Sequence, residues 1–501
     1  MTGATATRSK TVYEAVIGLE VHAQVLTRSK MFCSCAAGYQ GTEPNTHVCP
    51  VCMGMPGVLP VINGAAIEAT VLTGLALNCR INEKSKFDRK NYPYPDLVKG
   101  YQISQWDVPL CVKGWLEVEV EGKRTRLGVT RVHLEEDTAK LIHKTDPSGE
   151  SYSLVDLNRS GTPLMEIVGE PDMRSPEEAR EYLMKLQTIL QYLGVSTGNL
   201  EVGSMRCDAN VSIRPLGQTE LPKSKVEVKN MNSFRAVYRA LQFEIQRQAE
   251  VLEAGGRVVQ ETRGWNDARG VTVSQRSKEH AHDYRYFPEP DLPSVTVTRD
   301  WIEDLRRRLP ELPDAKRARF QDQYGLSAHD AEQLSQTKYM ADYYEEAVRL
   351  AGNLPNGAKA VSNWMLGELS RLLNVEARAL DDERVKIRPQ HIAELAALVE
   401  KKTINQTTAK QVLEQSFKSG KGPAQLVQEQ GQTQISSAAE IIPLVDQVIA
   451  ANPQAVKDFH SGKEPAIKFL VGQVMKVTKG RADPTLAREL LQKQLAGAPQ
   501  S

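Results

Sequence analysis

A change in sequence pattern just before Arg299 is the feature that most constrains the fold of this chain. Up to about Val297, short runs of alternating apolar and polar residues, such as Val16–Val25 and Leu127–Leu134, stand between glycines and prolines. Runs of this kind are typical of strands joined by turns. Beyond Arg299 the apolar residues have helical spacing, and prolines recur at the intervals of short helices. We therefore expect an α+β protein in which a body built on a mixed or antiparallel sheet precedes an all-helical region.

The same pattern predicts three domains, a number that suits a chain of 501 residues. The sheet-based body covers residues 1–297 and contains two helical segments, near Glu177–Leu193 and Phe234–Ala254. A helical domain follows at residues 298–405, and a smaller helical tail domain occupies residues 406–501.

Charge is unevenly distributed, although 63 Lys and Arg residues nearly balance 62 Asp and Glu residues over the whole chain. This balance excludes a uniformly basic surface of the kind found on histones. Residues 401–501, however, carry 13 basic and 8 acidic side chains, a net charge of +5. A local basic patch is therefore expected near the C-terminus.

No segment has the composition of a membrane span or a secretory signal. The longest apolar stretch, Val58–Leu77, is interrupted by Asn63 and Glu68, whereas a span needs about 20 mostly apolar residues. The first residues of the chain lack the apolar core of a signal peptide. We expect a cytoplasmic protein that has no membrane partner.

Four of the seven cysteines lie within twenty residues and predict a zinc site. Cys33, Cys35, Cys49 and Cys52 form the pattern C-x-C-x13-C-x2-C, and two close thiol pairs joined by a loop can surround one tetrahedral Zn²⁺. Four unrelated buried thiols or a redox pair are the alternatives. Because four thiolates leave no position for substrate, the zinc would have a structural role in the loop between Lys30 and Val58.

The run Val16–Val25 places Glu20 and His22 on one face of a strand, opposite an apolar face. A carboxylate beside an imidazole suits a divalent metal, or a general base with its orienting partner. The plainer alternative is the solvent-facing side of an edge strand.

Three further patches of polar residues interrupt otherwise apolar runs. Each alone is compatible with a solvated turn, but together with Glu20 and His22 they indicate one pocket that holds Mg²⁺ and a phosphorylated ligand. The patches contain His133, Glu135, Glu136 and Asp137; then Asp156, Asn158, Arg159 and Glu166; and finally Arg206, Asp208, Asn210 and Asn232.

The segment Ser85–Asp96 supplies basic and aromatic side chains for such a ligand. Lys86 and Lys90 stand beside Tyr92 and Tyr94, and cations interleaved with aromatic rings suit the phosphates and base of a nucleotide, or an RNA end. An exposed loop with ordinary charges is the alternative. The chain contains neither a G-x-x-x-x-G-K-[ST] nor a G-x-G-x-x-G motif, so a nucleotide would bind here in a different fold.

A series of long motifs carries a close resemblance to a known family, the B subunits of the aspartyl/glutamyl-tRNA(Asn/Gln) amidotransferases. The motifs are, in order, IGLEVHAQV, SKMFCSC, EPNTHVCPVC, PGVLPVIN, SKFDRKNYPYPD, RVHLEED, VDLNRSGTPLMEIV, RCDANVSIR and DYRYFPEPDLP. The segment AIKFLVGQVMKVTKGRADP resembles the C-terminal tRNA-binding region of that family. The resemblance spans nearly the whole chain.

The resemblance implies a heterotrimer with a glutamine-hydrolysing amidase subunit and a small third subunit. The B subunit would use ATP and Mg²⁺ to phosphorylate the side-chain carboxylate of Glu-tRNA(Gln) or Asp-tRNA(Asn). Ammonia from the amidase would then displace phosphate and leave the amide on the tRNA.

The resemblance also implies roles for individual residues, and it strengthens the expectation of zinc. Carried over by motif, Glu20, His22, Glu136 and Glu166 would be the catalytic residues linked to Mg²⁺. Glu135 is the alternative to Glu136, since alternation puts the two on opposite faces of a strand. Lys86, Lys90, Asn158 and Arg159 would surround the nucleotide or the acyl phosphate.

The tail has the pattern of a helix that packs on one side and meets RNA on another. Between Ala466 and Lys479 the apolar residues follow helical spacing. The basic residues Lys468, Lys476, Lys479 and Arg481 are expected to contact tRNA phosphates, although lysines that merely solvate a small bundle would look the same. The stretch Gln415–Ser437, rich in Gln, Gly and Ser, is a candidate hinge before this region.

Two other functions remain as alternatives. A zinc-containing tRNA-binding scaffold without catalysis would not need acidic residues within apolar strands. A small-molecule kinase is disfavoured by the missing phosphate loop and by the basic tail. The sequence leaves open whether Glu-tRNA(Gln), Asp-tRNA(Asn) or both are substrates.

Overall fold

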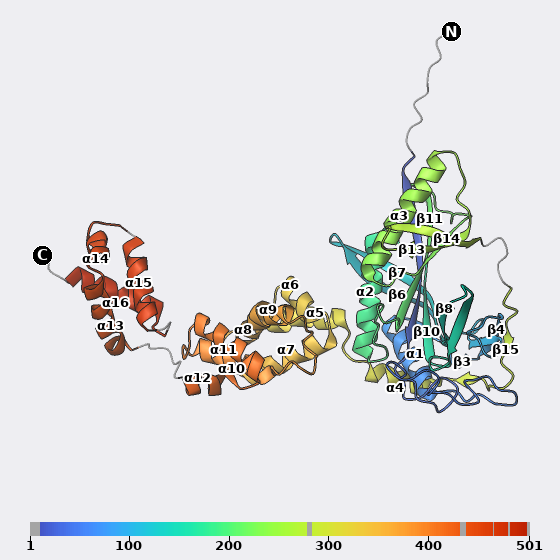
Figure 1. The fold of residues 1–501 in the computed structure, drawn as a ribbon, viewed down its shortest axis with the longest axis horizontal. Coiled ribbons are helices and arrows are strands. Elements are labelled where there is room, and N and C mark those ends of the chain that lie inside the picture. The colour runs from blue at the N-terminus through green and yellow to red at the C-terminus, as the bar shows by residue number, and fades with distance from the viewer. Residues whose placement is uncertain (1–10, 278–282, 431–436, 464, 479–480, 498–501) are drawn as a thin grey trace, which may run out of the picture. The chain divides into compact units, whose positions relative to one another are not determined.

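The computed structural model describes residues 11–277, 283–430, 437–463, 465–478 and 481–497. The chain divides into two compact units, Met1–Leu312 and Pro313–Ser501. Figure 1 shows the sheet in the first unit and the helices in the second. The α+β class expected from the sequence is confirmed.

A nine-stranded sheet forms the centre of the first unit, with the strand order β14-β13-β12-β11-β1-β10-β7-β6-β2. All neighbours in this order are antiparallel except β12 and β13, which are parallel. The expected mixed sheet is thus confirmed. Its strands are β1 (Tyr13–Gln24), β2 (Arg80–Ile81), β6 (Cys111–Val120), β7 (Lys123–Glu136), β10 (Pro163–Gly169), β11 (Met205–Pro215), β12 (Val226–Lys229), β13 (Glu261–Asn266) and β14 (Val271–Ser277).

One face of this sheet packs on helices and forms the hydrophobic core. Because side chains alternate along β1, Ile17, Leu19 and Val21 point to this face, and each is fully buried. The core also contains Leu186 of α2 and Leu241 of α3. The helices of this unit are α1 (Gly64–Ala76), α2 (Pro176–Leu193), α3 (Phe234–Glu253) and α4 (Arg299–Arg308).

The two helices expected in the body begin at serine caps. The Ser175 hydroxyl accepts a hydrogen bond from the Glu178 amide at the start of α2, and the Ser233 hydroxyl accepts one from Ala236 at the start of α3. Helix α2 ends at Gly194, whose φ of 68° is a left-handed conformation that glycine adopts without strain. The predicted segments are confirmed within a few residues.

Three small sheets accompany the large one: β15-β4-β5, β16-β3 and β8-β9. Strand β5 packs against β7 and so brings the first of these sheets to the central one. Their strands are β3 (Lys84–Ser85), β4 (Asp88–Asn91), β5 (Tyr101–Ser104), β8 (Lys140–Thr145), β9 (Ser151–Asp156), β15 (Phe287–Pro288) and β16 (Val295–Thr296).

The described part of the second unit is helical and has two hydrophobic cores. The first core includes Phe320, Tyr344 and Leu395. It is built by α5 (Pro313–Tyr324), α6 (Ala328–Leu334), α7 (Lys338–Ala351), α8 (Gly357–Trp364), a π-helical turn (Met365–Leu369), α9 (Ser370–Val375), α10 (Pro389–Glu400), α11 (Gln406–Ser419) and α12 (Pro423–Gln430). The second core includes Val445 and Leu470 and belongs to α13 (Ala438–Ala451), α14 (Pro453–His460), α15 (Pro465–Val477) and α16 (Pro484–Gly497).

The candidate hinge is largely helical. Residues up to Ser419 lie in α11 and Pro423–Gln430 form α12, with a three-residue connection between them, and residues 431–436 lie outside the described part of the chain. Val412 and Phe417 of α11 are buried in the core shared with α10, so these two helices pack with the domain before the expected tail. The domain limits at 297 and 405 otherwise stay predictions. Among the described helices, none is both long enough and apolar enough to cross a membrane.

Candidate metal centres

The polar face of the central sheet gathers functional side chains from neighbouring strands. His22 of β1 lies directly opposite Glu166 of β10, and Glu166 lies directly opposite His133 of β7. On its other side His22 faces Arg206 of β11. Because cross-strand partners share a face, the alternation that buries the apolar side of β1 brings these polar groups together on the other side.

Two histidines and two glutamates form a tight cluster on this face. His22 Nε2 lies 3.4 Å from Glu166 Oε2 and 3.7 Å from Glu135 Oε1. His133 Nε2 lies 3.2 Å from Glu166 Oε2 and 3.8 Å from Glu135 Oε2. One ligand atom each from His22, Glu135 and Glu166 lies within 4.8 Å of the others. Two carboxylates and one imidazole at this spacing can hold a divalent cation.

The cluster stabilises the charged form of each of its members. Burial lowers the pKa of His22, but the hydrogen bond to Glu166 and the charges of Glu166 and Glu135 raise it overall, to about 8. Burial also lowers the pKa of His133, but the negative charges of Glu166 and Glu135 and hydrogen bonds to them raise it overall. Burial raises the pKa of Glu166, but the two histidines hold it well below its ordinary value. Both carboxylates are therefore ionised and ready to accept a cation.

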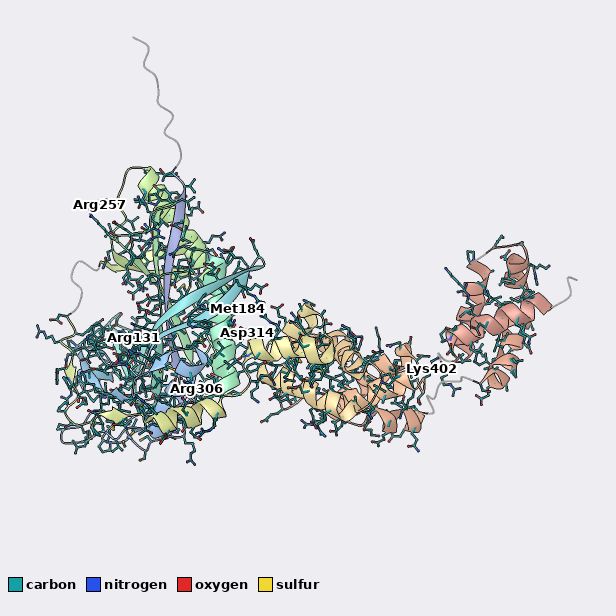
Figure 2. The ribbon with its side chains drawn as sticks, turned by 180° about the vertical axis from the view of Figure 1, so that it is seen from behind. Arg131, Met184, Arg257, Arg306, Asp314 and Lys402 are labelled. Carbon is teal, nitrogen blue, oxygen red and sulfur yellow. The ribbon has the colours of Figure 1, made fainter. Side chains whose placement is uncertain are left out.

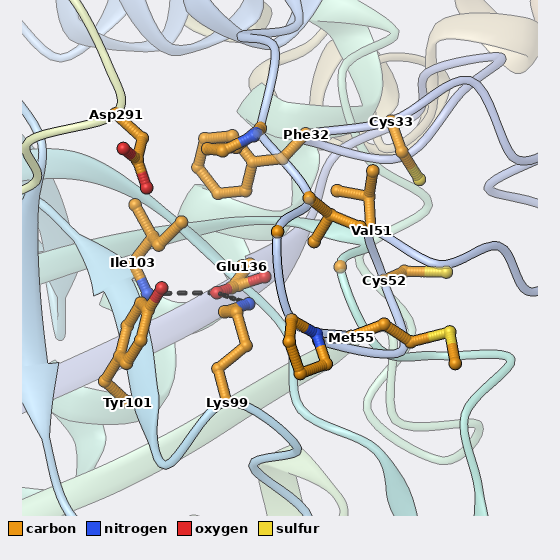
Figure 3. A pocket seen from close by; sticks show the side chains of 16 residues that line it. Phe32, Cys33, Val51, Cys52, Met55, Lys99, Tyr101, Ile103, Glu136 and Asp291 are labelled. Carbon is orange, nitrogen blue, oxygen red and sulfur yellow. Dashed lines mark hydrogen bonds and ion pairs between the residues drawn. The ribbon is translucent and has the colours of Figure 1, made fainter.

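Glu136, which we expected from the sequence to join the metal site, lies on the opposite face of β7. Its Oε1 accepts hydrogen bonds from Lys99 Nζ at 2.6 Å and from the Ile103 amide at 3.0 Å. Figure 3 shows these two hydrogen bonds, beside a cavity of about 260 Å³ that the cysteine loop also lines. Strand alternation continues to the end of β7, so Glu135 rather than Glu136 reaches His22.

Glu20 lies on the same face as His22 but is not one of the three grouped ligands. It accepts a hydrogen bond from Asn210 Nδ2 at 2.9 Å and faces Asp208 across the pair of strands β1 and β11. Asp208 in turn forms an ion pair with Lys229. The predicted patch that contains Asp208 and Asn210 thus adjoins the cluster and, with Lys229, extends its polar face along the sheet.

Four residues were predicted to bind phosphate, and of these Lys90 faces the cluster. Its ammonium nitrogen lies 5.1 Å from the ring centre of Tyr284 and 5.9 Å from that of Tyr92. Burial lowers its pKa, but the negative charges of Glu135 and Glu166 help to raise it overall. Lys86 instead forms ion pairs with Asp88 and, at 2.7 Å, with Asp107.

Asn158 and Arg159 hydrogen-bond to the protein backbone. The buried Asn158 side chain accepts a hydrogen bond from the His47 amide at 2.8 Å and donates one to the Glu43 carbonyl at 2.7 Å. Arg159 donates to the carbonyls of Thr138 and Ala139 at 2.9 and 2.8 Å. Asn158 therefore anchors the cysteine loop, and Arg159 fixes the chain that follows β7.

The four predicted cysteines converge as one group. Sγ atoms of Cys33, Cys35, Cys49 and Cys52 all lie within 4.8 Å of one another, and the four thiols are free. The amide of Cys49 donates to Cys52 Sγ at 3.2 Å. A four-thiol group of this size fits a tetrahedral Zn²⁺, whose bonds to sulfur are about 2.3 Å long.

The surroundings favour the thiolate form of Cys52 within this group. The pKa of Cys33 is raised, chiefly by its hydrogen bond with Cys52, and burial raises the pKa of Cys35 to about 11. The pKa of Cys52 is lowered to about 4, chiefly by its hydrogen bond with Cys33 and further by the Cys49 amide and the charge of Lys30. Lys30 is fully buried and donates to the carbonyls of His47 and Leu157 at 2.8 and 3.2 Å. Thiolates are the form of cysteine that binds zinc.

Two family models match the chain. One, described as the GatB/GatE catalytic domain, covers residues 15–303, and one described as the GatB domain covers residues 342–495. The chain belongs to the GatB family. It is 54% identical, over 97% of its length and 99% of the relative's, to the B subunit of the aspartyl/glutamyl-tRNA(Asn/Gln) amidotransferase from Dehalococcoides mccartyi strain CBDB1. The relative of the same name from Moorella thermoacetica is 55% identical over 96% of this chain and all of its own length.

Membership in the GatB family confirms the resemblance inferred from the motifs. In the tail, the expected packed face of α15 is confirmed, since Ile467, Leu470 and Val474 are buried. Lys468 and Lys476 are exposed on the same helix. Lys479 lies outside the described residues. Arg481 is half-buried, and its Nε donates to the Thr478 carbonyl at 3.3 Å.

His133 was expected in the pocket but was not named among the residues linked to Mg²⁺, and Tyr284 and Tyr286 were not expected near Lys90. Strict alternation from Glu135 back along β7 would have placed His133 on the same face. Tyr284 and Tyr286, whose ring centres are 5.9 Å apart, come from a motif almost 200 residues from Lys90 in sequence, so only tertiary structure brings them to it.

Proposed function

We propose that this chain is the B subunit of a tRNA-dependent amidotransferase of the cytoplasm. It would use ATP and Mg²⁺ to phosphorylate the side-chain carboxylate of glutamate on tRNA(Gln), of aspartate on tRNA(Asn), or of both. Ammonia from a partner subunit would then convert the acyl phosphate to the amide. The observation that carries the proposal is the cluster of His22, Glu135 and Glu166 beside the half-buried Lys90.

The chemistry explains why such a cluster is needed. A carboxylate resists attack by ammonia because its oxygen is a poor leaving group. Attack of the carboxylate oxygen on the γ-phosphorus of ATP forms a new P–O bond and releases ADP. Ammonia then attacks the acyl carbon, the C–O bond to phosphate breaks, and the nitrogen loses a proton as the amide forms. Negative charge thus accumulates around the transferred phosphoryl group, and cations must stabilise it.

The residues of the cluster suit this task. Glu135, Glu166 and His22 would hold Mg²⁺, which neutralises phosphate charge when bound. Lys90 carries a positive charge that interacts with both carboxylates, and it would attract the phosphate oxygens. Its ammonium group is sheltered between aromatic rings, so water competes weakly for it. Glu20, beside Asn210, would extend the site toward the bound amino acid.

The remaining features are assigned to structure and binding. Zn²⁺ at the four cysteines would stabilise the loop that Asn158 and Lys30 also hold. Lys468 and Lys476 of α15 would contact the tRNA backbone. Because the sequence contains nothing similar to the Ser-Lys centre of an amidase, glutamine hydrolysis belongs to an amidase subunit, with a small third subunit completing the complex.

The test is the identity of the amino acid on tRNA after reaction. The chain would be co-purified with its amidase and small subunits and incubated with ATP, Mg²⁺, glutamine and either Glu-tRNA(Gln) or Asp-tRNA(Asn). We expect esterified glutamine or asparagine only when ATP is present. Unchanged glutamate and aspartate from a folded complex that binds tRNA would favour the alternative, a zinc-containing tRNA-binding scaffold without catalysis.

A further inference from the structure

Arg131 of β7 is an arginine whose guanidinium group lacks a polar partner in the described structure. Its Nε is buried and has no hydrogen-bond partner there, and no ion pair involves its guanidinium group among the described residues. A buried donor without an acceptor costs free energy unless a ligand satisfies it. Its position, labelled in Figure 2, is on the sheet-based body.

Arg131 points to the same face of the sheet as the metal-binding cluster. Side chains two residues apart on a strand share a face, so Arg131, His133 and Glu135 form one row along β7. Arg131 pairs across to Val168, two residues from Glu166 on β10. The Cα atoms of Arg131 and His133 are therefore about 7 Å apart, a distance that an arginine side chain can span toward a ligand at the cluster.

The ring of Trp106 lies beside the guanidinium group and connects it, through Tyr286, to the cluster. The guanidinium carbon lies 5.2 Å from the ring centre of Trp106. Trp106 is stacked on Tyr286, with ring centres 4.5 Å apart and planes inclined by 8°. Tyr286 in turn lies in the electrostatic field of Lys90, Glu135 and Glu166: burial raises the pKa of its hydroxyl to about 12, and the charge of Lys90 opposes this rise.

The other arginines around this face are already paired. Arg89 forms two hydrogen bonds of 2.8 Å with the Glu289 carboxylate. Arg159 donates to two backbone carbonyls, and Arg206 forms an ion pair of 2.8 Å with Asp137. Arg131 differs from these three because its donors remain available while its guanidinium group lies beside Trp106.

We propose that Arg131 binds phosphate oxygens at the edge of the His22–Glu135–Glu166 cluster, with Trp106 and Tyr286 as the platform that orients its guanidinium group. The planar fork of arginine matches two oxygens of one phosphoryl group. The phosphoryl group is either that of the bound nucleotide or that of the acyl phosphate. This inference rests on the proposed function, because only phosphoryl transfer brings such an oxyanion to the cluster.

The test compares Arg131→Gln with Arg126→Gln in the assembled complex. Arg126 lies on the same strand and stacks on Trp115 at 3.9 Å, but it pairs with Glu117 at the surface and is 60% exposed. The assay measures kcat and KM for ATP in ADP formation with misacylated tRNA present. Glutamine hydrolysis and tRNA binding report on folding, and Arg131→Lys retains the charge without the fork.

For Arg131→Gln we expect a loss of about tenfold to a hundredfold in kcat/KM for ATP, the effect of removing hydrogen bonds to a charged group. Arg131→Lys should lose less, and Arg126→Gln should match the unaltered complex. A higher KM alone would place the guanidinium on the nucleotide, and a lower kcat alone would place it on the phosphoryl group during transfer.

Two results would overturn the proposal. In the first, Arg131→Gln matches Arg126→Gln within twofold. In the second, Arg131→Gln lowers tRNA binding and glutamine hydrolysis as much as ADP formation, which marks a structural role. If the unaltered complex forms no ADP at all, the proposed function fails instead, and the inference about Arg131 falls with it.

Discussion

The adjacent residues Glu135 and Glu136 offer a sharp test of the metal site, because they lie on opposite faces of β7. Glu135 has its oxygens 3.7 and 3.8 Å from the Nε2 atoms of His22 and His133, whereas Glu136 accepts hydrogen bonds from Lys99 and Ile103. Replacing each by glutamine removes one negative charge and changes the volume little. The two substitutions should therefore have different consequences.

Glu135→Gln should weaken the binding of a divalent cation. A divalent cation and a carboxylate about 4 Å apart interact with about 8 kcal/mol at the effective dielectric constant of about 20 that suits protein sites. The glutamine oxygen and water recover part of this energy. We expect a net loss of about 3 kcal/mol, or roughly a hundredfold increase in Kd.

Glu136→Gln should affect stability instead of metal binding. The glutamine oxygen still accepts from the Ile103 amide, but the ammonium group of Lys99, 16% exposed, loses its charged partner. We expect the free energy of unfolding to fall by about 1–3 kcal/mol, with little change in cation affinity.

Titration of the assembled complex with Mn²⁺ in the absence of ATP measures the change in cation affinity. Calorimetry or electron paramagnetic resonance detects the bound ion. Urea unfolding of the same variants measures the change in stability. The reasoning is refuted if Glu136→Gln weakens Mn²⁺ binding by the larger factor, or if Glu135→Gln leaves it unchanged while the protein remains folded.

Three further predictions concern the zinc site, the loop anchor and the tail. Elemental analysis should find one zinc per chain, and Cys52→Ser should lose it together with thermal stability; full zinc content in that variant would contradict the four-thiolate site. Asn158→Ala should lower the free energy of unfolding by about 1–3 kcal/mol, because it leaves the His47 amide and the Glu43 carbonyl without their buried partner; unchanged urea unfolding would contradict this. Lys468→Glu with Lys476→Glu should weaken tRNA binding and reduce its salt dependence, whereas arginine at both positions should preserve it; equal affinity of both double variants would remove α15 from the RNA contact.

Much of the fold follows from sequence patterns that act locally. Alternation in Val16–Val25 places Glu20 and His22 opposite a buried apolar face, as β1 shows. Serine caps mark the starts of α2 and α3. The four cysteines converge as their spacing predicts, because a short loop keeps them close whatever the rest of the chain does.

The parts that sequence could not provide depend on contacts between distant segments. Asn158 and Arg159 have side chains suited to phosphate, but both side chains form hydrogen bonds to backbone groups instead. Asn158 bonds to the cysteine loop, and Arg159 bonds to the chain after β7. Lys86 is held by two nearby carboxylates. Conversely, nothing in the sequence singles out Arg131, and the absence of a polar partner among the described residues distinguishes it.

The pair Glu135 and Glu136 shows a third case, in which the sequence contained the answer. Counting from His133 along the alternating strand selects Glu135 for the face of His22. The uncertainty lay in whether β7 continues regularly through Leu134 to its end, and the register with β10 shows that it does.

The central claim is that the cluster of His22, Glu135 and Glu166 supports transfer of phosphate from ATP to the amino acid on tRNA. Hydroxylamine tests it most directly, because it traps an acyl phosphate as a hydroxamate when glutamine is omitted. The assembled complex would be incubated with ATP, Mg²⁺, misacylated tRNA and hydroxylamine, alongside Glu166→Gln and the control Glu170→Gln, which changes an exposed carboxylate just after β10. We predict hydroxamate on the tRNA-bound amino acid with one ADP formed for each, a rate at least about a hundredfold lower for Glu166→Gln, and a normal rate for Glu170→Gln. Hydroxamate formation without ATP consumption, or an undiminished rate of hydroxamate formation in Glu166→Gln, would contradict the account.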